Sequence, residues 1–433
     1  LGNFFRAHQA WYTDQAPDAH HWGIAAFTGR RAAVADALGP QDGLYTLVTR
    51  AADDDRREII GSISATHRAT DHAAWLGYLT SPEVAVLTLT VTEAGYLRDR
   101  QGRLDTSNEQ VRRDAATLQV EPYAPVSSVP ARLLAGLLAR ERAGLGPVAL
   151  VPCDNLPGNG EVIADAVRTM AALVDPALTT VVDRMASFVT TVVDRITPAT
   201  TPADVDAVRN ATGLDDAVPV VTEPFSEWIL SGDFPAGRPQ WEYAGAQVVA
   251  DVTPFERRKL SLLNGAHSLL AYGASIRGHA TVAEAVADEV CRGWLEQWWD
   301  EAARHLDLPA EDIAAYRTAL LDRFGSPRIR HALSQIAADG SQKLPVRILP
   351  TLRAELDAGR LPAGATRAVA AWVCHLRGQG APLTDPQADA ASAAAAGPLT
   401  DAVPRVLALL DERPFDADVH AMIVAHAEEL AQT

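Results

Sequence analysis

The sequence predicts an α/β protein in two parts, a parallel sheet covered by helices and then a mostly α-helical domain. Its 433 residues are enough for two domains. Strand-like and helix-like stretches alternate through the first half, and residues 84–91 (VAVLTLTV) form a nearly continuous apolar run, typical of a strand buried on both faces. After Asp251 the pattern changes to long helical periods. We therefore expect domains at 1–250 and 251–433.

Individual elements follow from the same patterns. Strands are expected at 22–27, 44–48, 84–91 and 147–152, with the strand at 84–91 near the sheet centre, and a helix at 132–143 leads into the last of them. Helices are expected at 259–272, 282–305, 310–323, 365–376 and 404–410. Trp294, Trp298 and Trp299 fall at helical spacing, which favours core or interdomain packing over a ligand cage. The alanine-rich residues 390–396 are expected to be a loop or a helix end.

Composition excludes several classes of partner. A net charge of −17 and a pI near 5.1 argue against a nucleic-acid-binding surface and against adsorption to anionic lipid. The three cysteines lack metal-ligand spacing, so neither a structural zinc nor a disulfide framework is expected, and a reducing compartment suits them. We see no apolar run of about 18 residues and no signal peptide, which predicts a cytoplasmic protein without a membrane span.

The first residues, LGNFFRAH, contain half of a dinucleotide-binding fingerprint. If they open a helix after a strand, Gly2 lets the backbone approach a pyrophosphate, and the amino end of the helix offers N–H groups to it. Phe5 stands where the third glycine of the usual pattern would be. Because the chain starts at Leu1, within this motif, we expect further residues upstream.

The run KLSLLNGAH, residues 259–267, is the strongest catalytic candidate. On an α-helix, with about 100° per residue, His267 lies roughly 80° and Asn264 roughly 140° from Lys259, so all three share one half of the cylinder. A partly buried lysine has a lowered pKa and can exchange protons near neutrality. Asn264 can then donate to an oxygen that gains negative charge, while His267 holds the lysine or a substrate hydroxyl. A helix whose lysine reaches water beside satisfied core residues fits the same pattern.

Several blocks together resemble the long-chain polyol-specific dehydrogenases, the family that includes mannitol 2-dehydrogenase and fructuronate reductase. They run in order across most of the chain, from GNFFRAHQAWY at its start through CDNLPGNG to SQIAADGSQKLP. The blocks are residues 2–12, 41–48, 89–93, 153–160, 193–198, 223–225, 255–267 and 330–345. The resemblance implies a Rossmann-type nucleotide-binding domain, a helical substrate domain, a zinc-independent oxidoreductase and a monomer.

The resemblance also implies a role for each matching residue. Lys259 would be the general base in alcohol oxidation and the general acid in ketone reduction. Asn155 and Asn264 would stabilise the alkoxide-like oxygen, His267 would orient the substrate and the lysine, and Glu256 would carry protons between Lys259 and solvent. No metal site is implied.

Further site residues lie at element ends. Asp194 and Arg195 are expected at the substrate, with a buried ion pair at a strand end as the alternative. Thr92 and Glu93 end the strand at 84–91, where open sheets bind ligands, so a place near the nicotinamide is expected and a solvated strand end is the alternative. The cofactor-binding candidates of the whole chain are Gly2, Asn3, Phe4, Arg6, Arg30, Thr92 and Glu93.

The substrate is expected to be a small sugar acid or polyol. Gln335, eight residues before Lys343, makes that block more similar to fructuronate reductases, and Lys343 can pair with a sugar-acid carboxylate, with Arg330 and Arg347 as helpers. An ordinary hydroxyl or a local ion pair is the alternative for Lys343. The segments DNLP (154–157) and DVTP (251–254) resemble the mannitol branch equally well. D-mannonate/D-fructuronate therefore leads narrowly over D-mannitol/D-fructose or another polyol such as arabinitol, and a descendant that only binds, or a scaffold, remains a further alternative.

The cofactor is expected to be NAD, as in the family, with NADP use also plausible. NAD enzymes place an acidic residue after the second strand to bind the ribose 2′-hydroxyl. Here Arg30 and Arg31 follow that strand, and Asp36 comes several residues late. The two arginines suit either the 2′-phosphate of NADP or a solvated helix start.

Overall fold

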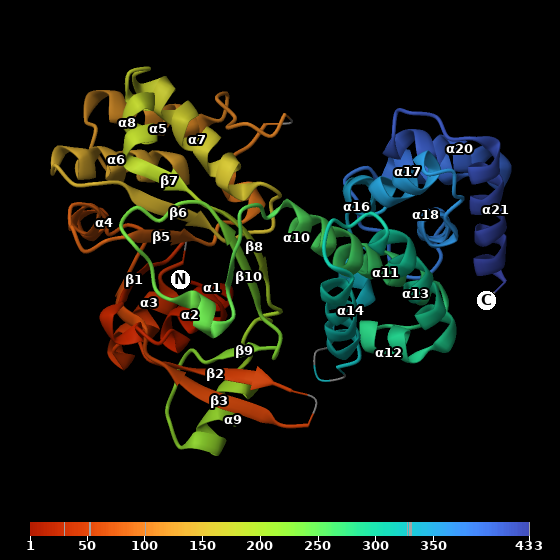
Figure 1. Cartoon of the computed structure of the whole chain (residues 1–433), viewed down its shortest axis with the longest axis horizontal. Helices are drawn as coiled ribbons and strands as arrows, with labels where there is room; N and C mark the ends of the chain where they lie inside the picture. The colour runs from red at the N-terminus through yellow and green to blue at the C-terminus, as the bar shows by residue number, and fades with distance from the viewer. Residues whose placement is uncertain (30, 52, 100, 327, 329–330, 433) are drawn as a thin grey trace. The chain divides into compact units, whose positions relative to one another are not determined.

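The computed structural model describes residues 1–433 except 30, 52, 100, 327, 329, 330 and 433. The chain divides into two compact units, Leu1–Thr253 and Pro254–Thr433 (Figure 1). The first unit combines strands with helices, and the second is built from helices. The predicted fold class, an α/β unit followed by a helical one, is confirmed.

Strands of the first unit form four small sheets within the described ranges, in the orders β1-β4, β11-β10-β8, β3-β2-β9 and β5-β6-β7. The pair β1-β4 and the trio β5-β6-β7 are parallel. The predicted strands correspond to β1, β2, β5 and β6. The bounds are β1 (Ile24–Phe27), β2 (Tyr45–Arg50), β3 (Asp55–Ile60), β4 (Ile63–His67), β5 (Val86–Leu89), β6 (Val148–Pro152), β7 (Ala186–Phe188), β8 (Thr190–Asp194), β9 (Val220–Thr222), β10 (Glu227–Ser231) and β11 (Gln247–Val248).

β5 is not near the centre of its sheet, where the sequence predicts the strand at 84–91. β5 is an outer strand of its three-stranded sheet, paired through Val86 and Leu89 with β6 alone among the described strands. A groove of about 490 Å³ lies between it and β1. An apolar run indicates burial, and among the described strands only β6 pairs with β5, so the run does not reveal how many strands flank it.

All five residues of β6 are buried. The helices α5, α6, α7 and α8 lie over one side of β6 and β7 (Figure 1), where their leucines and valines form a core. On the other side Ala149 and Val151 pack with Tyr12 and Trp228. The helices of this unit are α1 (Asn3–Ala7), α2 (Gln9–Gln15), α3 (Ala33–Leu38), α4 (His72–Leu79), α5 (Glu109–Val120), α6 (Val129–Arg142), α7 (Asn159–Val174), α8 (Leu178–Met185) and α9 (Pro202–Thr212), with 3₁₀ turns η1 (Ala19–His21), η2 (Gly39–Gln41), η3 (Glu93–Tyr96) and η4 (Trp241–Ala244).

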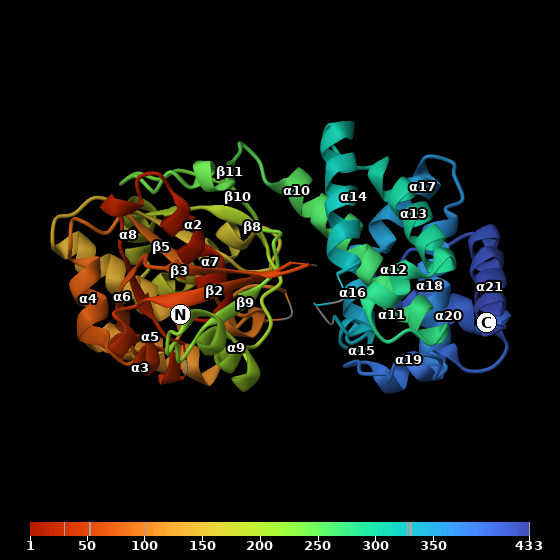
Figure 2. The same ribbon diagram turned by 90° about the horizontal axis from the view of Figure 1, so that it is seen from below.

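The second unit is organised around α18, whose residues from Gly364 to Leu376 are all buried. It packs against α11, α13 and α21, which run beside it in Figure 2. Each described helix of the chain is too short or too polar to cross a membrane. The elements are α10 (Thr253–Arg258), the π-helical segment η5 (Lys259–Gly265), α11 (Ala266–Ile276), α12 (Val282–Ala287), α13 (Glu289–Ala303), α14 (Ala310–Phe324), α15 (Leu333–Ile336), α16 (Gly340–Arg347), α17 (Leu349–Asp357), α18 (Ala363–Leu376), α19 (Ala388–Ala395), α20 (Leu399–Leu410) and α21 (Ala417–Ala431).

The helix predicted at 282–305 is divided, because Asp288 is extended and its side chain accepts the backbone N–H of Val290 and Cys291 to cap α13. Residues 390–396, expected to be a loop or a helix end, form the carboxyl-terminal part of α19, with Ala396 as its C-cap. Alanine has the highest helix propensity, and Ala391 and Ala395 are buried, so propensity and packing agree.

Candidate active site

The helix that carries Lys259 changes its winding at that residue. The sequence predicts one α-helix over 259–272, but the structure has a π-helical segment, η5, between α10 and α11. A π-helix closes its hydrogen bonds on residue i+5, and such turns occur frequently at functional sites. The angles expected for an α-helix therefore do not apply. Lys259 and Asn264 are five positions apart, so the wider turn brings them onto the same side, where an α-helix would separate them by roughly 140°.

Two tryptophans of α13 stabilise this wider turn. The indole N–H of Trp298 donates to the Ser261 carbonyl at 2.9 Å, and that of Trp299 donates to the Leu262 carbonyl at 2.8 Å. Side chains that bond to helix carbonyls disturb the regular α ladder. Gly265 then lets the Trp298 ring lie against the backbone, since a Cβ at residue 265 would stand 2.4 Å from that ring. The tryptophans are core residues, as predicted, and they also shape the segment that carries Lys259.

His267 follows the π-turn and lies at the start of α11. Its side chain is buried, its ring centroid lies 4.8 Å from that of Phe324 and 4.9 Å from that of His331, and its Nε2 has no hydrogen-bond partner among the described residues. Burial, together with His331 and Arg323, holds the pKa of His267 well below its ordinary value. The imidazole is therefore neutral at physiological pH.

Helix α16 brings further positive groups to this region, because it packs against both η5 and α11. Lys343 is half-buried, and its ammonium donates to the carbonyls of Ile336 at 3.1 Å and Ala338 at 2.5 Å. Arg347, one turn further along, donates to Ser268 Oγ at 3.5 Å. Burial first, and then Arg347, lower the pKa of Lys343. Lys343 and its predicted helper Arg347 thus lie on the same helix, which packs against the segment that carries His267.

In the first unit, Asn155 lies in the exposed loop between β6 and α7. Asp154 shapes this loop: it accepts the N–H of Leu156 at 2.9 Å and the hydroxyl of Tyr96. Thr92 follows β5 and precedes η3. Because β5 and β6 are parallel neighbours, Thr92 and Asn155 leave the sheet at the same edge, where open α/β sheets bind ligands.

Asp194 and Arg195 are both buried at the end of β8. The Arg195 guanidinium donates to the carbonyls of Ala7 and Glu223, and it stacks on the Trp11 ring 4.6 Å from its centroid. These contacts join three segments of the first unit. They assign Arg195 a structural role, and its contact with substrate stays a prediction.

The fingerprint residues begin the short helix α1, with Gly2 as its N-cap. Arg6 is 1% exposed, donates to Asn3 Oδ1 at 2.8 Å and to the Val218 carbonyl, and lies 5.2 Å from the Tyr45 ring centroid. Burial lowers its pKa to about 10. Phe4 stacks on the ring of His8. The internal contacts of Arg6 explain its presence without a cofactor, and its predicted cofactor contact stays a prediction.

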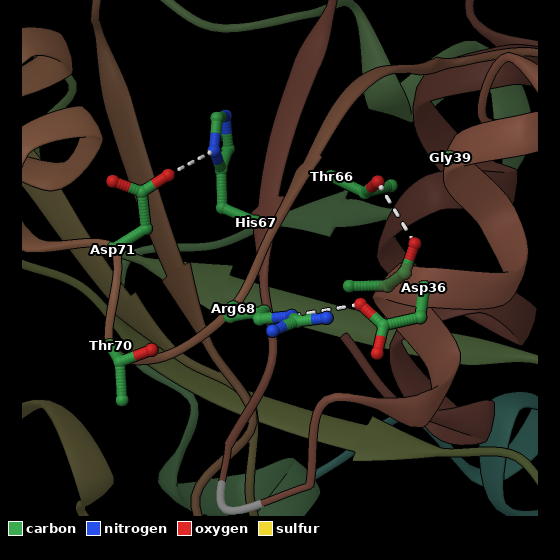
Figure 3. Close-up of a pocket in the computed structure, with 8 residues that line it drawn as sticks. Asp36, Gly39, Thr66, His67, Arg68, Thr70 and Asp71 are labelled. Atoms are coloured by element: carbon green, nitrogen blue, oxygen red, sulfur yellow. Dashed lines mark hydrogen bonds and ion pairs between the residues drawn. The ribbon is translucent and has the colours of Figure 1, made fainter.

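A pocket of about 440 Å³ opens at the carboxyl end of β4, which pairs in parallel with β1, and α3 lines it from the other side. Figure 3 shows Arg68 Nε paired with Asp36 at 2.9 Å and His67 Nδ1 bonded to Asp71 at 3.1 Å. Thr66 also lines this pocket. Of these residues the sequence had indicated only Asp36, because β4 was not predicted and no motif marks it.

Of the other predicted site residues, Arg30 and Arg330 lie outside the described residues. Arg31 is exposed, Glu256 is half-buried on α10, and Glu93 begins η3.

One cluster has the residue types of a metal site, namely His279, Asp288 and Cys291. The Asp288 carboxylate already bonds to His279 at 2.9 Å and to the Arg277 guanidinium at 2.9 Å, and it caps α13. A permanent cation on the same oxygen disfavours a second one. We therefore interpret this cluster as structural.

Comparison with known proteins places this geometry in a family. Residues 1–243 match the mannitol dehydrogenase Rossmann domain, and residues 251–431 match the mannitol dehydrogenase C-terminal domain. The chain belongs to the mannitol dehydrogenase family. It is therefore an oxidoreductase of the class that acts on CH–OH groups, as the resemblance implied.

Individual relatives agree with this assignment. D-mannonate oxidoreductase of Escherichia coli (strain K12) is 35% identical over 87% of this chain and 79% of its own length. The structure of Pseudomonas fluorescens mannitol 2-dehydrogenase with NAD and D-mannitol is 33% identical, with a TM-score of 0.79, and covers 100% of this chain and 90% of that one. A substrate-free D-sorbitol dehydrogenase structure is 28% identical, with a TM-score of 0.92 and coverage of 100% and 92%. These relatives act on different substrates, so family membership alone does not choose one.

Proposed function

We propose that the protein interconverts a secondary alcohol and a ketone of a sugar acid or sugar alcohol, with Lys259 as general base and general acid. The distribution of lysine carries the proposal. Of the 38 lysines and arginines, two are lysines, Lys259 and Lys343. Arginine meets nearly every need for a cation in this chain, but it cannot give up its proton. An ε-amine at Lys259, on a π-turn, is the group that such proton transfer requires.

The proposed roles follow from the chemistry of each side chain. In oxidation, Lys259 takes the hydroxyl proton while the carbinol carbon loses a hydride, and in reduction it returns the proton. Bound NAD would accept that hydride. The amides of Asn264 and Asn155 donate to the oxygen as it becomes alkoxide-like, a contribution worth about 3 kcal/mol per donor in comparable sites. Neutral His267 bonds to a substrate hydroxyl, and Glu256 passes protons between Lys259 and solvent.

The favoured substrate pair is D-fructuronate and D-mannonate. The support is the positive group of Lys343 on the helix that packs against η5 and α11, which suits a carboxylate. Similarity to D-mannonate oxidoreductase points the same way. The second candidate is D-fructose and D-mannitol, favoured by the similarity to mannitol 2-dehydrogenase.

The favoured cofactor is NAD. The pocket at the end of β4 offers the Asp36 carboxylate and the Thr66 hydroxyl, which fit ribose hydroxyls, and a carboxylate repels a 2′-phosphate. Arg68, paired with Asp36, keeps NADP use open.

The central test is the variant Lys259→Ala. We expect it to abolish hydride transfer, measured as NADH or NADPH oxidation with fructuronate, tagaturonate and fructose in parallel, and to retain NADH binding. Arg257→Ala removes an exposed neighbouring cation on α10 and should keep turnover. Unchanged turnover in Lys259→Ala would eliminate Lys259 as the base, and preference for fructose would move the protein to the mannitol branch.

A further inference from the structure

Arg347 forms no ion pair with any of the residues that the structure describes. The residue is half-buried, and burial lowers the pKa of its guanidinium, which nevertheless stays charged. None of its five N–H donors bonds to a carboxylate in the part of the chain that the structure describes, and its one hydrogen bond is the 3.5 Å contact with Ser268 Oγ. By contrast, the half-buried Arg353 of the same unit pairs with Asp411 at 2.8 Å.

The surroundings of Arg347 are positive as well. Ser268, which it contacts, is the neighbour of His267 in the chain, and Lys343 lies one turn before it on α16. Arg323, Arg347 and Lys343 all lower the pKa of His267 through their charges. Two carboxylates, Asp339 and Asp385, act on Lys343, but Asp385 is already bonded to the N–H and hydroxyl of Ser341. Because Arg347 itself forms no ion pair with a carboxylate of the described residues, its partly buried charge costs stability unless a ligand supplies an anion.

We propose that Arg347, together with Lys343, binds the carboxylate of the substrate, so that the protein selects sugar acids over neutral polyols. This inference rests on the proposed function, because it assigns one end of the substrate of that site. The guanidinium presents two parallel N–H groups that match a carboxylate, and Lys343 has used two of its three N–H donors on carbonyls. A neutral polyol offers no charge to either residue. Arg347 is thus a specificity-determining residue, and hydride transfer remains with Lys259.

The test measures binding by calorimetry in the presence of NADH, which prevents turnover of the alcohol substrates. The probes are D-mannonate, D-mannitol and D-mannitol 1-phosphate, and the variants are Arg347→Met and Lys343→Met. Arg413→Met is the matched control, since it removes one positive charge from a side chain that is 64% exposed. We expect Arg347→Met to weaken mannonate binding about 30- to 100-fold, as the loss of a charge-assisted pair would, and to leave mannitol binding within about twofold.

Further results decide the proposal. Equal losses for mannonate and mannitol, or no loss, would overturn it, and tighter binding of mannitol 1-phosphate than of mannonate would assign the anion site to a phosphate. Arg347→Met should also raise the melting temperature without ligand, because it removes an uncompensated charge, which shows that the variant folds. If mannonate binding depends on Arg347 but the chain turns over no sugar acid or polyol, the proposed function fails and the anion site stands. If the chain turns over a sugar acid or polyol but mannonate binds Arg347→Met as tightly as the parent chain, the proposed function stands and the anion site fails.

Discussion

Replacing Gly265 by alanine tests the packing that widens the helix at Lys259. The backbone of Gly265, with φ −64° and ψ −45°, is helical, so alanine on its own would stabilise the helix by about 0.5–1 kcal/mol. Its methyl group would, however, stand 2.4 Å from Cζ2 and 2.8 Å from Cε2 of Trp298. That ring is fully buried and bonded to the Ser261 carbonyl, so it cannot move without losing this bond.

The net change in stability of Gly265→Ala depends on which of these energies is larger. Overpacking a core costs about 1–3 kcal/mol, and loss of the indole hydrogen bond adds about 1 kcal/mol. After subtraction of the helix propensity gain, Gly265→Ala should destabilise the helical unit by about 2 kcal/mol. In a domain of this size that lowers the melting temperature by about 4–8 °C. Turnover should fall too, because Lys259 and Asn264 lie on the displaced turn.

Gly293 provides the matched control. It is exposed in the middle of α13, and a Cβ there would meet nothing within 4 Å. Gly293→Ala should therefore raise the melting temperature by about 1–4 °C. Thermal denaturation followed by far-ultraviolet circular dichroism compares the two variants with the parent chain. If Gly265→Ala is as stable as Gly293→Ala, the contact with Trp298 does not constrain the π-turn, and our explanation of its geometry is refuted.

Three other variants test electrostatic features. Arg360, followed by His305, holds the pKa of Glu355 at about 2, so the stabilisation by this buried carboxylate is present above about pH 4.5 and is lost as pH falls toward 2. Glu355→Gln should cost about 2–4 kcal/mol at pH 7 and much less near pH 2; denaturation midpoints across that range check this, and a pH-independent cost would contradict it. Asp36→Ala should weaken NADH binding at least severalfold while Arg68→Ala mainly weakens NADPH binding, as measured by fluorescence titration. Unchanged dissociation constants in both variants would remove the pocket at the end of β4 from the cofactor site.

Sequence alone determined the fold class, the family and the catalytic candidates, because each is encoded in local pattern or residue type. Alternating strands and helices and the later helical periods are read along the chain without knowledge of long-range contacts. Lys259, Asn264 and His267 lie within nine consecutive positions, so they are close along the chain whatever helix forms there. The family blocks are likewise short segments with characteristic residues.

Tertiary structure decided what depends on contacts between distant segments. The π-turn is stabilised by Trp298 and Trp299, each 37 positions beyond the carbonyl that it binds, and no periodicity within 259–267 announces it. The same holds for the outer position of β5, since an apolar run reveals burial but not the identity of its neighbours. Arg347 was only a secondary candidate in the sequence, because what distinguishes it is the absence of a carboxylate beside it in the described structure. The partners of a charge are set by folding, and for that reason its lack of compensation is visible only in three dimensions.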